Sequence, residues 1–466
     1  MAGVDMSSED SGAERVYACI DLKTFYASVE CIDRELDPFT TNLVVADPDR
    51  SNTTICLAVS PAMKALGVRN RCRVFEIPRD IPYIMAKPRM RRYMEVSAQI
   101  YGIYLGFVSP QDIHPYSIDE CFIDVTPYLK RYGLSAKAFA QRLMDAVRTR
   151  TGICATAGVG TNLFLAKVAL DITAKHVKDN IGYLDEERFR REIWQHRPIT
   201  DIWGIGPGIA ARLATYGVYD LMGVAALDEQ VLYNEFGVNA EYLIDHAFGR
   251  EPTTIADIQA YRPAETSYVN GQVLPQNYRN SEAHLVLKEM VDTSVLELVD
   301  RAQVCDHISL YVGYAGGAVG ADDAMADGKA ALRTDELPSY IVGEHGTRRA
   351  GSRGSWAHGG GSRKLPVRTN SFRKLMGAFD ALWKETVDPA RFIRRISIGF
   401  GNLLPEDFAT YDLFCDLDAE AREHNLARAV LAVKDKYGKN ALLKGMSLTE
   451  KATARERNEQ VGGHHA

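Results

Sequence analysis

The sequence predicts an α+β protein built from several domains. Its 466 residues are too many for one hydrophobic core, so three or four domains are expected. Strand-like and amphipathic helical stretches alternate over residues 16–180, whereas residues 181–256 are mainly helical in pattern. From residue 265 the order is strand, helix, strand, strand, helix, strand, which indicates an α+β sandwich.

The composition is that of an ordinary globular protein. Hydrophobic residues make up 46% and charged residues 25%, and no apolar run is long enough for a membrane span. Residues 1–14 are polar and acidic, which predicts a short disordered N-terminus rather than a signal peptide. The eight cysteines form no Cys-x-x-Cys pair, which argues against a zinc site or a disulfide framework and favours the cytoplasm.

The net charge of −6 conceals a basic segment. Residues 345–374 contain Lys and Arg but no Asp or Glu. The Gly- and Ser-rich part, 345–362, is typical of a solvated loop. Residues 363–374 include Arg363, Lys364 and Arg368. These residues either contact a phosphate backbone or form a solvated face, and the sequence does not decide between the two.

Two adjacent carboxylates interrupt an apolar stretch over residues 114–125, which is predicted to be a strand. Asp119 and Glu120 would point to opposite faces of this strand, and burying them is costly without a compensating cation or hydrogen bonds. A second apolar strand, residues 16–20, ends at Asp21. If the two strands are neighbours, the three carboxylates converge. Such oxygen ligands suit Mg²⁺ or Mn²⁺.

These residues carry a resemblance to a known family. Asp21 with Phe25-Tyr26-Ala27-Ser28-Val29-Glu30, and later Ser117-Ile118-Asp119-Glu120, resembles the catalytic pattern of the Y-family translesion DNA polymerases. The resemblance extends from about residue 16 to the C-terminus and is closest to the UmuC-type branch of Gram-positive bacteria. It implies a right-hand polymerase with palm, small fingers, helical thumb and α+β little finger. The domains expected are a palm (15–24 and 80–180), fingers (25–79), a thumb (181–256), a linker (257–264), a little finger (265–405) with an insertion at about 315–363, and a C-terminal tail (406–466).

The resemblance also implies the catalytic residues. Asp21, Asp119 and Glu120 would be catalytic and, with the backbone carbonyl of Leu22, would bind two Mg²⁺ ions, with Mn²⁺ as a substitute. Asp119 would face the shared metal site, and Glu120 would turn toward the primer terminus. The reaction is attack of a primer 3′-hydroxyl on a deoxynucleoside triphosphate.

Four residues are expected at the nucleotide. Tyr26 would be the steric gate that excludes a ribose 2′-hydroxyl, and Phe25 beside it also suits a core position. Lys64 lies on a short helix that begins at Ser60-Pro61 and ends at Gly67. Lys167 lies on a helix that follows a glycine-rich strand, residues 154–160. By themselves both lysines read as surface charges; the resemblance assigns both to the triphosphate.

A glycine-rich hairpin in the thumb indicates DNA binding. Residues 202–213 resemble a helix-hairpin-helix, in which Gly204, Gly206 and Gly208 let backbone N–H groups approach a phosphate. The alternative is a helix-helix turn that contains glycine for structural reasons only. Such a contact positions DNA without reading its sequence.

A short segment after the little finger resembles a linear motif. Residues 410–414, including Asp412, Leu413 and Phe414, are similar to the segment that binds the bacterial sliding clamp. Thr410 stands where the usual first residue is Gln, and a helix-capping segment is the alternative.

The function expected from the resemblance is DNA synthesis of low fidelity opposite damaged template bases, within an SOS-type damage response. The partners expected are primer-template DNA, deoxynucleoside triphosphates and a sliding clamp, for a monomeric, nucleoid-associated subunit. A metal-dependent nuclease and a non-catalytic DNA- and clamp-binding relative are the alternatives. Retention of Tyr26, Lys64 and Lys167 disfavours the nuclease, and the presence of all three carboxylates disfavours the non-catalytic relative.

Overall fold

The computed structural model describes residues 15–49, 52–263, 266–318, 358–413 and 415–465. The chain divides into two compact units, one over 1–262 and one over 263–463. The division falls inside the predicted linker. Over the described residues, no helix has the length and apolar character needed to cross a membrane.

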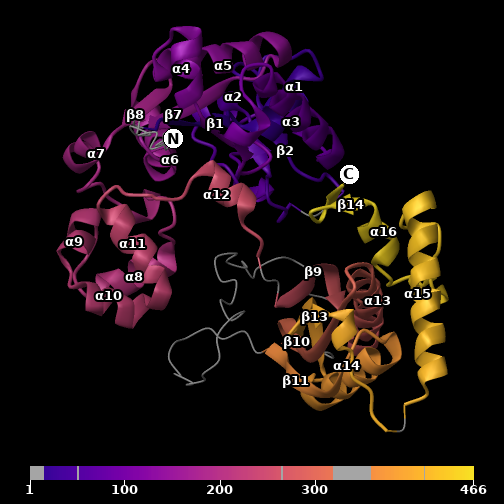
Figure 1. Ribbon diagram of the computed structural model, residues 1–466. Helices are drawn as coiled ribbons and strands as arrows, with labels where there is room; N and C mark the ends of the chain where they lie inside the picture. Colours follow the sequence, from indigo (N-terminus) through magenta and orange to yellow (C-terminus); the bar gives the residue numbers. More distant parts are fainter. Residues whose placement is uncertain (1–14, 50–51, 264–265, 319–357, 414, 466) are drawn as a thin grey trace, which may run out of the picture. The chain divides into compact units, whose positions relative to one another are not determined.

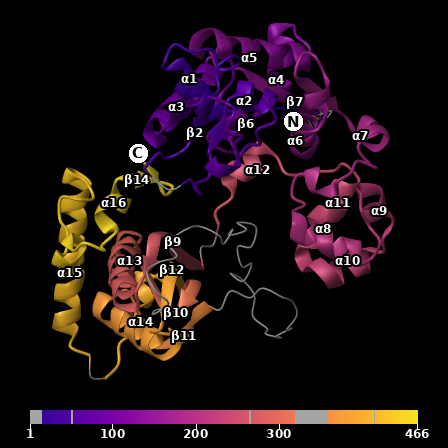
Figure 2. The same ribbon diagram turned by 180° about the vertical axis from the view of Figure 1, so that it is seen from behind.

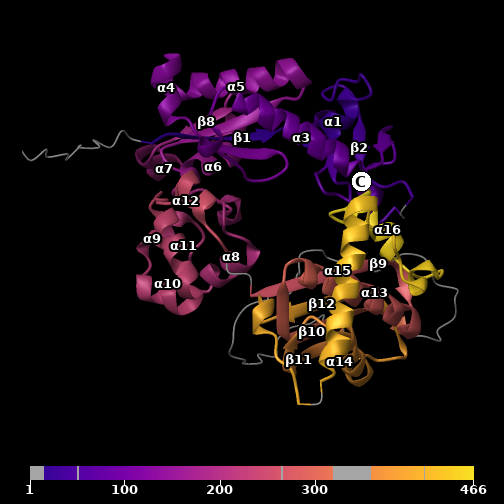
Figure 3. The ribbon, with the colours of Figure 1, turned by 45° about the vertical axis from the view of Figure 1, so that its right-hand side comes forward.

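The first unit is built on a five-stranded sheet with the order β5-β6-β1-β7-β8. Its strands are β1 (Tyr17–Leu22), β5 (Ile113–Pro115), β6 (Glu120–Asp124), β7 (Ala155–Gly160) and β8 (Ile181–Leu184). Figure 3 shows the sheet between α5 (Ala136–Thr151) on one side and α6 (Leu163–Asp171) on the other. Because β8 pairs with β7, this sheet includes Ile181–Leu184, which follow the end of the predicted palm at residue 180.

Alternation along β1 divides its side chains between two cores. Ala18, Ile20 and Leu22 pack with α5 and with α3 (Met90–Leu105) in the larger core. Tyr17 and Cys19 lie on the other face, against α6. This period of two places Asp21 on the α6 side of the sheet.

Two glycines of β7 allow α6 to approach the sheet closely. A Cβ on Gly158 would lie 2.1 Å from the carbonyl oxygen of Ala166, and one on Gly160 would lie 2.3 Å from the backbone nitrogen of Ala166. Any larger residue would therefore push α6 away. The glycine-rich strand noted in the sequence serves this close packing and brings Lys167 near the sheet.

The single strand predicted over residues 114–125 is a hairpin of β5 and β6 instead. Pro115 has no N–H to continue a ladder, and the N–H groups of Tyr116 and Ser117 both bond to the carbonyl of Glu120. Asp119 therefore stands in the turn before β6, and the strict alternation predicted for Asp119 and Glu120 does not apply.

The segment between α1 (Phe25–Ile32) and α3 has a small core of its own. Its sheet has the order β3-β2-β4. Its elements are β2 (Leu43–Val45), β3 (Ala58–Val59), α2 (Pro61–Ala65) and β4 (Ile84–Ala86). The Ser60 side chain accepts a bond from the Met63 N–H and caps α2, as the Ser60-Pro61 pair predicts.

The remaining part of the first unit is helical, and Figure 2 shows α8, α9, α10 and α11 gathered in one group. The helices after the hairpin are α4 (Thr126–Tyr132), α7 (Glu186–Glu192), α8 (Pro207–Ala214), α9 (Leu221–Ala226), α10 (Glu229–Phe236), α11 (Ala240–Ala247) and α12 (Ile255–Ala260). The indole N–H of Trp203 donates to the Tyr116 hydroxyl at 3.1 Å, which ties this helical part to the palm hairpin.

The second unit has a sheet of order β11-β10-β12-β9 with α13 and α14 packed on one face (Figure 1). Its elements are β9 (Ser267–Tyr278), α13 (Asn280–Asp300), β10 (Gln303–Ala318), β11 (His358–Thr369), α14 (Phe372–Thr386), β12 (Arg391–Gly401) and β13 (Leu404–Pro405). Most of the predicted insertion, residues 319–357, lies outside the described residues.

The C-terminal segment contains regular structure, with α15 (Leu417–Tyr437) beside α13 and α16 (Ala454–Asn458) further on (Figure 3). The buried carboxylate of Glu289 on α13 accepts bonds from the N–H groups of Thr453 at 2.8 Å and Ala454 at 3.2 Å. These bonds fix the start of α16 to α13. The last strands are β14 (Gln460–Val461) and β15 (His464–His465).

Candidate active site

The pairing of β1 with β6 brings the three carboxylates together. Asp21 lies directly opposite Glu120 in the antiparallel register. The N–H of Leu22 donates to the carbonyl of Asp119 at 2.9 Å, which fixes the turn residue beside the end of β1. The two strands are therefore neighbours, which is the arrangement that the sequence argument required.

Asp119 is oriented by its own turn. The Ser117 hydroxyl donates to Oδ1 of Asp119 at 2.7 Å, and the same hydroxyl oxygen accepts from the Asp119 N–H at 3.3 Å. Ser117 therefore holds the carboxylate in one orientation.

The electrostatics of Asp21 reflect crowding of negative charge. Burial, followed by the charges of Asp119 and Glu120, raises the pKa of Asp21 to about 7, and the charge of Lys167 opposes this rise. A carboxylate with such a raised pKa gains from a nearby cation, because the cation favours its ionised form. Asp21 is thus a carboxylate on which burial and the neighbouring negative charges act together.

Lys167 is bound to the carboxylate cluster. Its Nζ lies 2.6 Å from Oε1 of Glu120 and 3.0 Å from Oδ1 of Asp171, and only 7% of the residue is exposed. Burial lowers the pKa of Lys167, but the hydrogen bond to Glu120 and the charge of Asp171 outweigh burial and raise it. The Cys19 thiol donates to the same Glu120 oxygen at 3.2 Å. The structure thus places the buried Lys167 in an ion pair with Glu120.

Lys64 lies within electrostatic range of Asp21, and Lys175 lies within electrostatic range of Lys64. Partial burial lowers the pKa of Lys64, the charge of Asp21 raises it, and the charge of Lys175 lowers it. Lys175 is exposed and lies in the short 3-10 turn Thr173–His176 after α6. The sequence reasoning did not select Lys175, although the turn that ends α6 was a signal that its side chain would leave the helix surface.

Tyr26 and Phe25, at the start of α1, have different surroundings. Phe25 is 2% exposed and belongs to the main core. Tyr26 is partly exposed, and its ring stacks on Tyr93 with 4.5 Å between ring centroids. Burial and the charge of Asp119 raise the pKa of Tyr26, and Arg71 lowers it. Tyr26 is therefore within electrostatic range of Asp119, and Arg71 is a cation near it that sequence reasoning missed.

The donor set suits a hard divalent cation. The pairing of β1 with β6 places Asp21, Asp119 and Glu120 at one edge of the sheet, and carboxylate oxygens are ligands that such cations prefer. Over the described part of the chain, no three His, Cys, Asp or Glu side chains form a ready-made metal cage. The pairing of Glu120 with Lys167 accounts for this, because it turns one carboxylate toward the lysine.

The thumb hairpin leaves its glycines open. A Cβ at Gly204, Gly206 or Gly208 would meet nothing within 4 Å. Gly204 has φ +86°, which only glycine adopts readily, whereas Gly206 caps the N-terminus of α8 in extended backbone. The hairpin therefore presents bare backbone ahead of a helix N-terminus, which suits a phosphate.

The three basic residues predicted to bind DNA in the second unit have different settings. Arg363 pairs with Glu385 of α14 at 2.5 Å, and Arg368 pairs with Asp306 at 2.6 Å. Lys364 lies opposite His307, on the sheet face away from α13 and α14. The register places two further candidates on that face, Arg395 and Tyr311, which the sequence analysis did not select.

The predicted clamp-binding segment begins at Thr410, which is anchored to β11. The Thr410 hydroxyl accepts from the Arg368 N–H at 2.7 Å, and the Thr410 N–H donates to the Arg368 carbonyl at 3.0 Å. Leu413 is 99% exposed, and Asp412 is exposed as well. Phe414 lies outside the described residues.

Comparison with known proteins identifies the class. The impB/mucB/samB family model matches residues 20–171, and the model for that family's C-terminal domain matches residues 265–413. A putative UV-damage repair protein, UvrX, of Bacillus subtilis (strain 168) is 27% identical over 96% of this chain and 96% of its own length. DNA polymerase IV 2 of the same organism is 28% identical over 97% of this chain and 99% of its own length.

A solved structure supports the fold. The Y-family DNA polymerase chimera Dbh-Dpo4(243-245)-Dbh matches with a TM-score of 0.58 and 18% identity, covering 84% of this chain and 99% of the chimera.

A carboxylate edge on a palm-like sheet, followed by a helical hairpin region and an α+β unit, defines a nucleotide-polymerising enzyme. The chain belongs to the impB/mucB/samB family of Y-family translesion DNA polymerases, of the Gram-positive UmuC-like kind, as the sequence resemblance predicted.

Proposed function

We propose that this chain synthesises DNA across damaged template bases with low fidelity, using Asp21, Asp119 and Glu120 as its catalytic carboxylates. The observation that carries the proposal is the pairing of β1 with β6, which brings these three groups to one edge of the sheet, with Lys64 within electrostatic range of Asp21. The printed names of the two Bacillus subtilis relatives, a UV-damage repair protein and a DNA polymerase, agree with it.

Asp21, Asp119 and the Leu22 carbonyl would hold Mg²⁺, with Mn²⁺ as a substitute, and Glu120 would complete the site. Two such ions supply Lewis-acid activation of the primer hydroxyl and charge stabilisation at the leaving group. Ser117 keeps Asp119 oriented for this role through the 2.7 Å bond to its Oδ1.

The lysines divide the remaining work. Lys64 and Lys175 would bind the triphosphate oxygens as point charges, because Lys64 is within electrostatic range of Asp21 and Lys175 is within electrostatic range of Lys64. Lys167 would neutralise the charge of Glu120 and orient its carboxylate through their ion pair. This division modifies the sequence-based proposal, in which Lys167 itself contacts the triphosphate.

Tyr26 would act as the steric gate. It is within electrostatic range of Asp119 and is partly exposed, so its ring can lie against the sugar of the incoming nucleotide. Phe25 supports it from the core. A ribose 2′-hydroxyl would collide with the ring, which makes deoxynucleotides the substrate.

DNA would be held through its phosphates. The backbone at Gly204, Gly206 and Gly208 suits one phosphate contact, and Lys364 with Arg395 on the sheet face of the second unit suits others. Arg363 and Arg368 would support this surface through their ion pairs with Glu385 and Asp306 rather than contact DNA themselves.

The exposed Leu413, with Asp412 and Phe414, would bind a sliding clamp by filling an apolar pocket. The chain would work as a monomeric polymerase subunit at the nucleoid.

Primer extension tests the proposal. Wild type should extend a primer with deoxynucleotides and Mg²⁺, on intact template and past an abasic site, while Asp119→Ala with Glu120→Ala should show no extension. Extension by the double variant would overturn the assignment. Labelled DNA incubated with Mg²⁺ and no nucleotide should stay intact, because cleavage there would favour the nuclease alternative.

A further inference from the structure

The Tyr26 ring rests on a second tyrosine that no role assigned so far explains. Tyr93 of α3 is fully buried, and the two rings stack at 4.5 Å with 19° between their planes. Stacked aromatic rings restrict each other's rotation. Tyr93 therefore closes one side of the space into which Tyr26 could swing.

Tyr93 is seated by a buried carboxylate on the same helix as Tyr26. Its hydroxyl donates to Oε1 of Glu30 at 2.8 Å, and Glu30 is 0% exposed. Glu30 follows Tyr26 by four residues on α1, so the two side chains lie on one face of that helix. One helix thus provides both the Tyr26 ring and the group that fixes the ring behind it.

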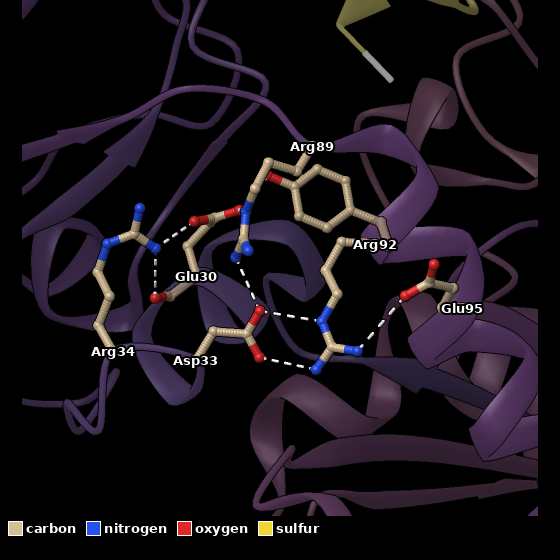
Figure 4. Close-up of polar contacts among 7 residues, drawn as sticks. Glu30, Asp33, Arg34, Arg89, Arg92 and Glu95 are labelled. Atoms are coloured by element: carbon tan, nitrogen blue, oxygen red, sulfur yellow. Dashed lines mark hydrogen bonds and ion pairs between the residues drawn. The ribbon is translucent and has the colours of Figure 1, made fainter.

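Glu30 is held in place by two guanidinium groups, which Figure 4 shows around it. Nε of Arg89 donates to Oε1 of Glu30 at 2.8 Å, and Arg34 pairs with the other carboxylate oxygen. A buried carboxylate is tolerated only with such compensation. The pairs continue outward, since Asp33 binds both Arg89 and Arg92.

We propose that Tyr93, seated by Glu30, is a positioning residue that holds the Tyr26 ring in the conformation that excludes ribonucleotides. The inference rests on the proposed role of Tyr26 as the steric gate. A gate of this kind works only if its ring cannot rotate out of the way of a 2′-hydroxyl, since a ring that has moved aside no longer occupies the space of that hydroxyl. The stack on Tyr93 prevents that rotation.

The test measures the ratio of kcat/KM for a deoxynucleotide to kcat/KM for the matching ribonucleotide, in single-nucleotide primer extension. This ratio does not depend on the fraction of active protein, so a variant that is only destabilised leaves it unchanged. Tyr93→Leu removes the ring and should lower the ratio roughly three- to tenfold, as expected when one stacking contact is lost. Tyr93→Phe keeps the ring and should retain most of the wild-type ratio.

Two further variants separate the possible causes of failure. Arg92→Ala breaks the outer pair with Asp33 without touching Glu30 or Tyr93, and should leave the ratio at the wild-type value. Tyr26→Ala should abolish selectivity; if it does not, the proposed gate itself is wrong. If Tyr26→Ala abolishes selectivity while Tyr93→Leu keeps the wild-type ratio, the role of Tyr93 alone is overturned.

A Tyr93→Phe ratio as low as that of Tyr93→Leu would also overturn the proposal, because the ring would then not be the cause. Should Tyr93→Leu not fold, judged by circular dichroism, Tyr93→Met takes its place under the same criteria. Methionine fills a similar volume without a planar ring.

Discussion

Lys64, Lys167 and Lys175 differ in their surroundings, and this difference predicts different roles for them. Lys167 is buried and bonded to Glu120, whereas Lys175 is exposed beyond the end of α6. Lys167 therefore stabilises the carboxylate of Glu120, whereas the exposed side chain of Lys175 can contact a ligand.

Alanine substitution should distinguish these lysines kinetically. Lys175→Ala is expected to raise the KM for the deoxynucleotide about tenfold with a smaller change in kcat, because it removes a charge that binds the triphosphate. Lys167→Ala should mainly lower kcat, since Glu120 loses its 2.6 Å partner. Steady-state kinetics on one primer-template checks both. Equal KM effects for the two variants would contradict the division.

At the scale of elements, the contact between α1 and α3 is electrostatic at its solvent side. Asp33, which caps the C-terminus of α1, accepts two bonds from Arg92, at 3.0 and 2.8 Å, and one from Arg89 at 2.8 Å. The hydrogen bonds from Arg92 and then Arg89 lower the pKa of Asp33 against the effect of burial.

This lowered pKa gives stability a defined pH dependence. An acid whose pKa is lower in the folded state stabilises the fold above its unfolded value, about 3.9, and the gain disappears as pH falls through the folded value. Asp33→Asn should lower the free energy of unfolding at pH 7 by about 1–2 kcal/mol. The difference from wild type should shrink as the pH is lowered below about 4.

Chemical denaturation at neutral and at progressively lower pH measures this difference. A double variant with Arg92→Ala is the control, because it should cost less than the sum of the single changes if the two groups are coupled. A difference that stays constant with pH would exclude the carboxylate charge as its source.

Local patterns were sufficient to predict some of these elements but not others. The apolar strand ending at Asp21 and the Ser60 cap were readable because each depends on nearby residues. The division of 114–125 into a hairpin was missed, although Pro115 was a local signal for it. The stack of Tyr26 on Tyr93 and the bonds from Glu289 to Thr453 join residues far apart in sequence, so no spacing pattern encodes them.

The site was predictable to a similar degree. The three carboxylates were found because charged residues inside apolar strands are conspicuous, and the pairing of β1 with β6 brings them together. The pairing of Lys167 with Glu120 depends on how closely α6 packs on β7, which is a matter of tertiary contact rather than of sequence.

At the scale of the whole molecule, basic residues of the second unit differ in whether they can reach DNA. Lys364 lies on the sheet face without helices, whereas its neighbour Arg363 is bound to Glu385. The formal net charge of −6 thus coexists with a local surface suited to phosphates.

Salt titration of DNA binding should show this difference. Lys364→Ala is expected to weaken binding on all sequences and to reduce the slope of log K against log salt by about one, because one phosphate contact is lost. Arg363→Ala, one residue away, should leave the slope near the wild-type value. Fluorescence anisotropy with a labelled primer-template gives both slopes, and equal losses would contradict the proposed orientation of the sheet.

The ion pairs between α1 and α3 have an evolutionary consequence. Asp33 and Arg89 bound the stretch that forms the β3-β2-β4 sheet, and they bind each other at 2.8 Å, so that stretch leaves and re-enters the palm at one place. One face of that sheet has a small core of its own, whereas Leu43, Val45, Ala58 and Ala86 on the other face pack into the larger core with α1 and α3. An exchange of this segment for that of a relative would keep the places where it leaves and re-enters the first unit, but the new segment would have to match the packing on α1 and α3. It would also bring its own residue to the position of Lys64, so the exchange would alter the proposed triphosphate contact while the carboxylate strands stay intact.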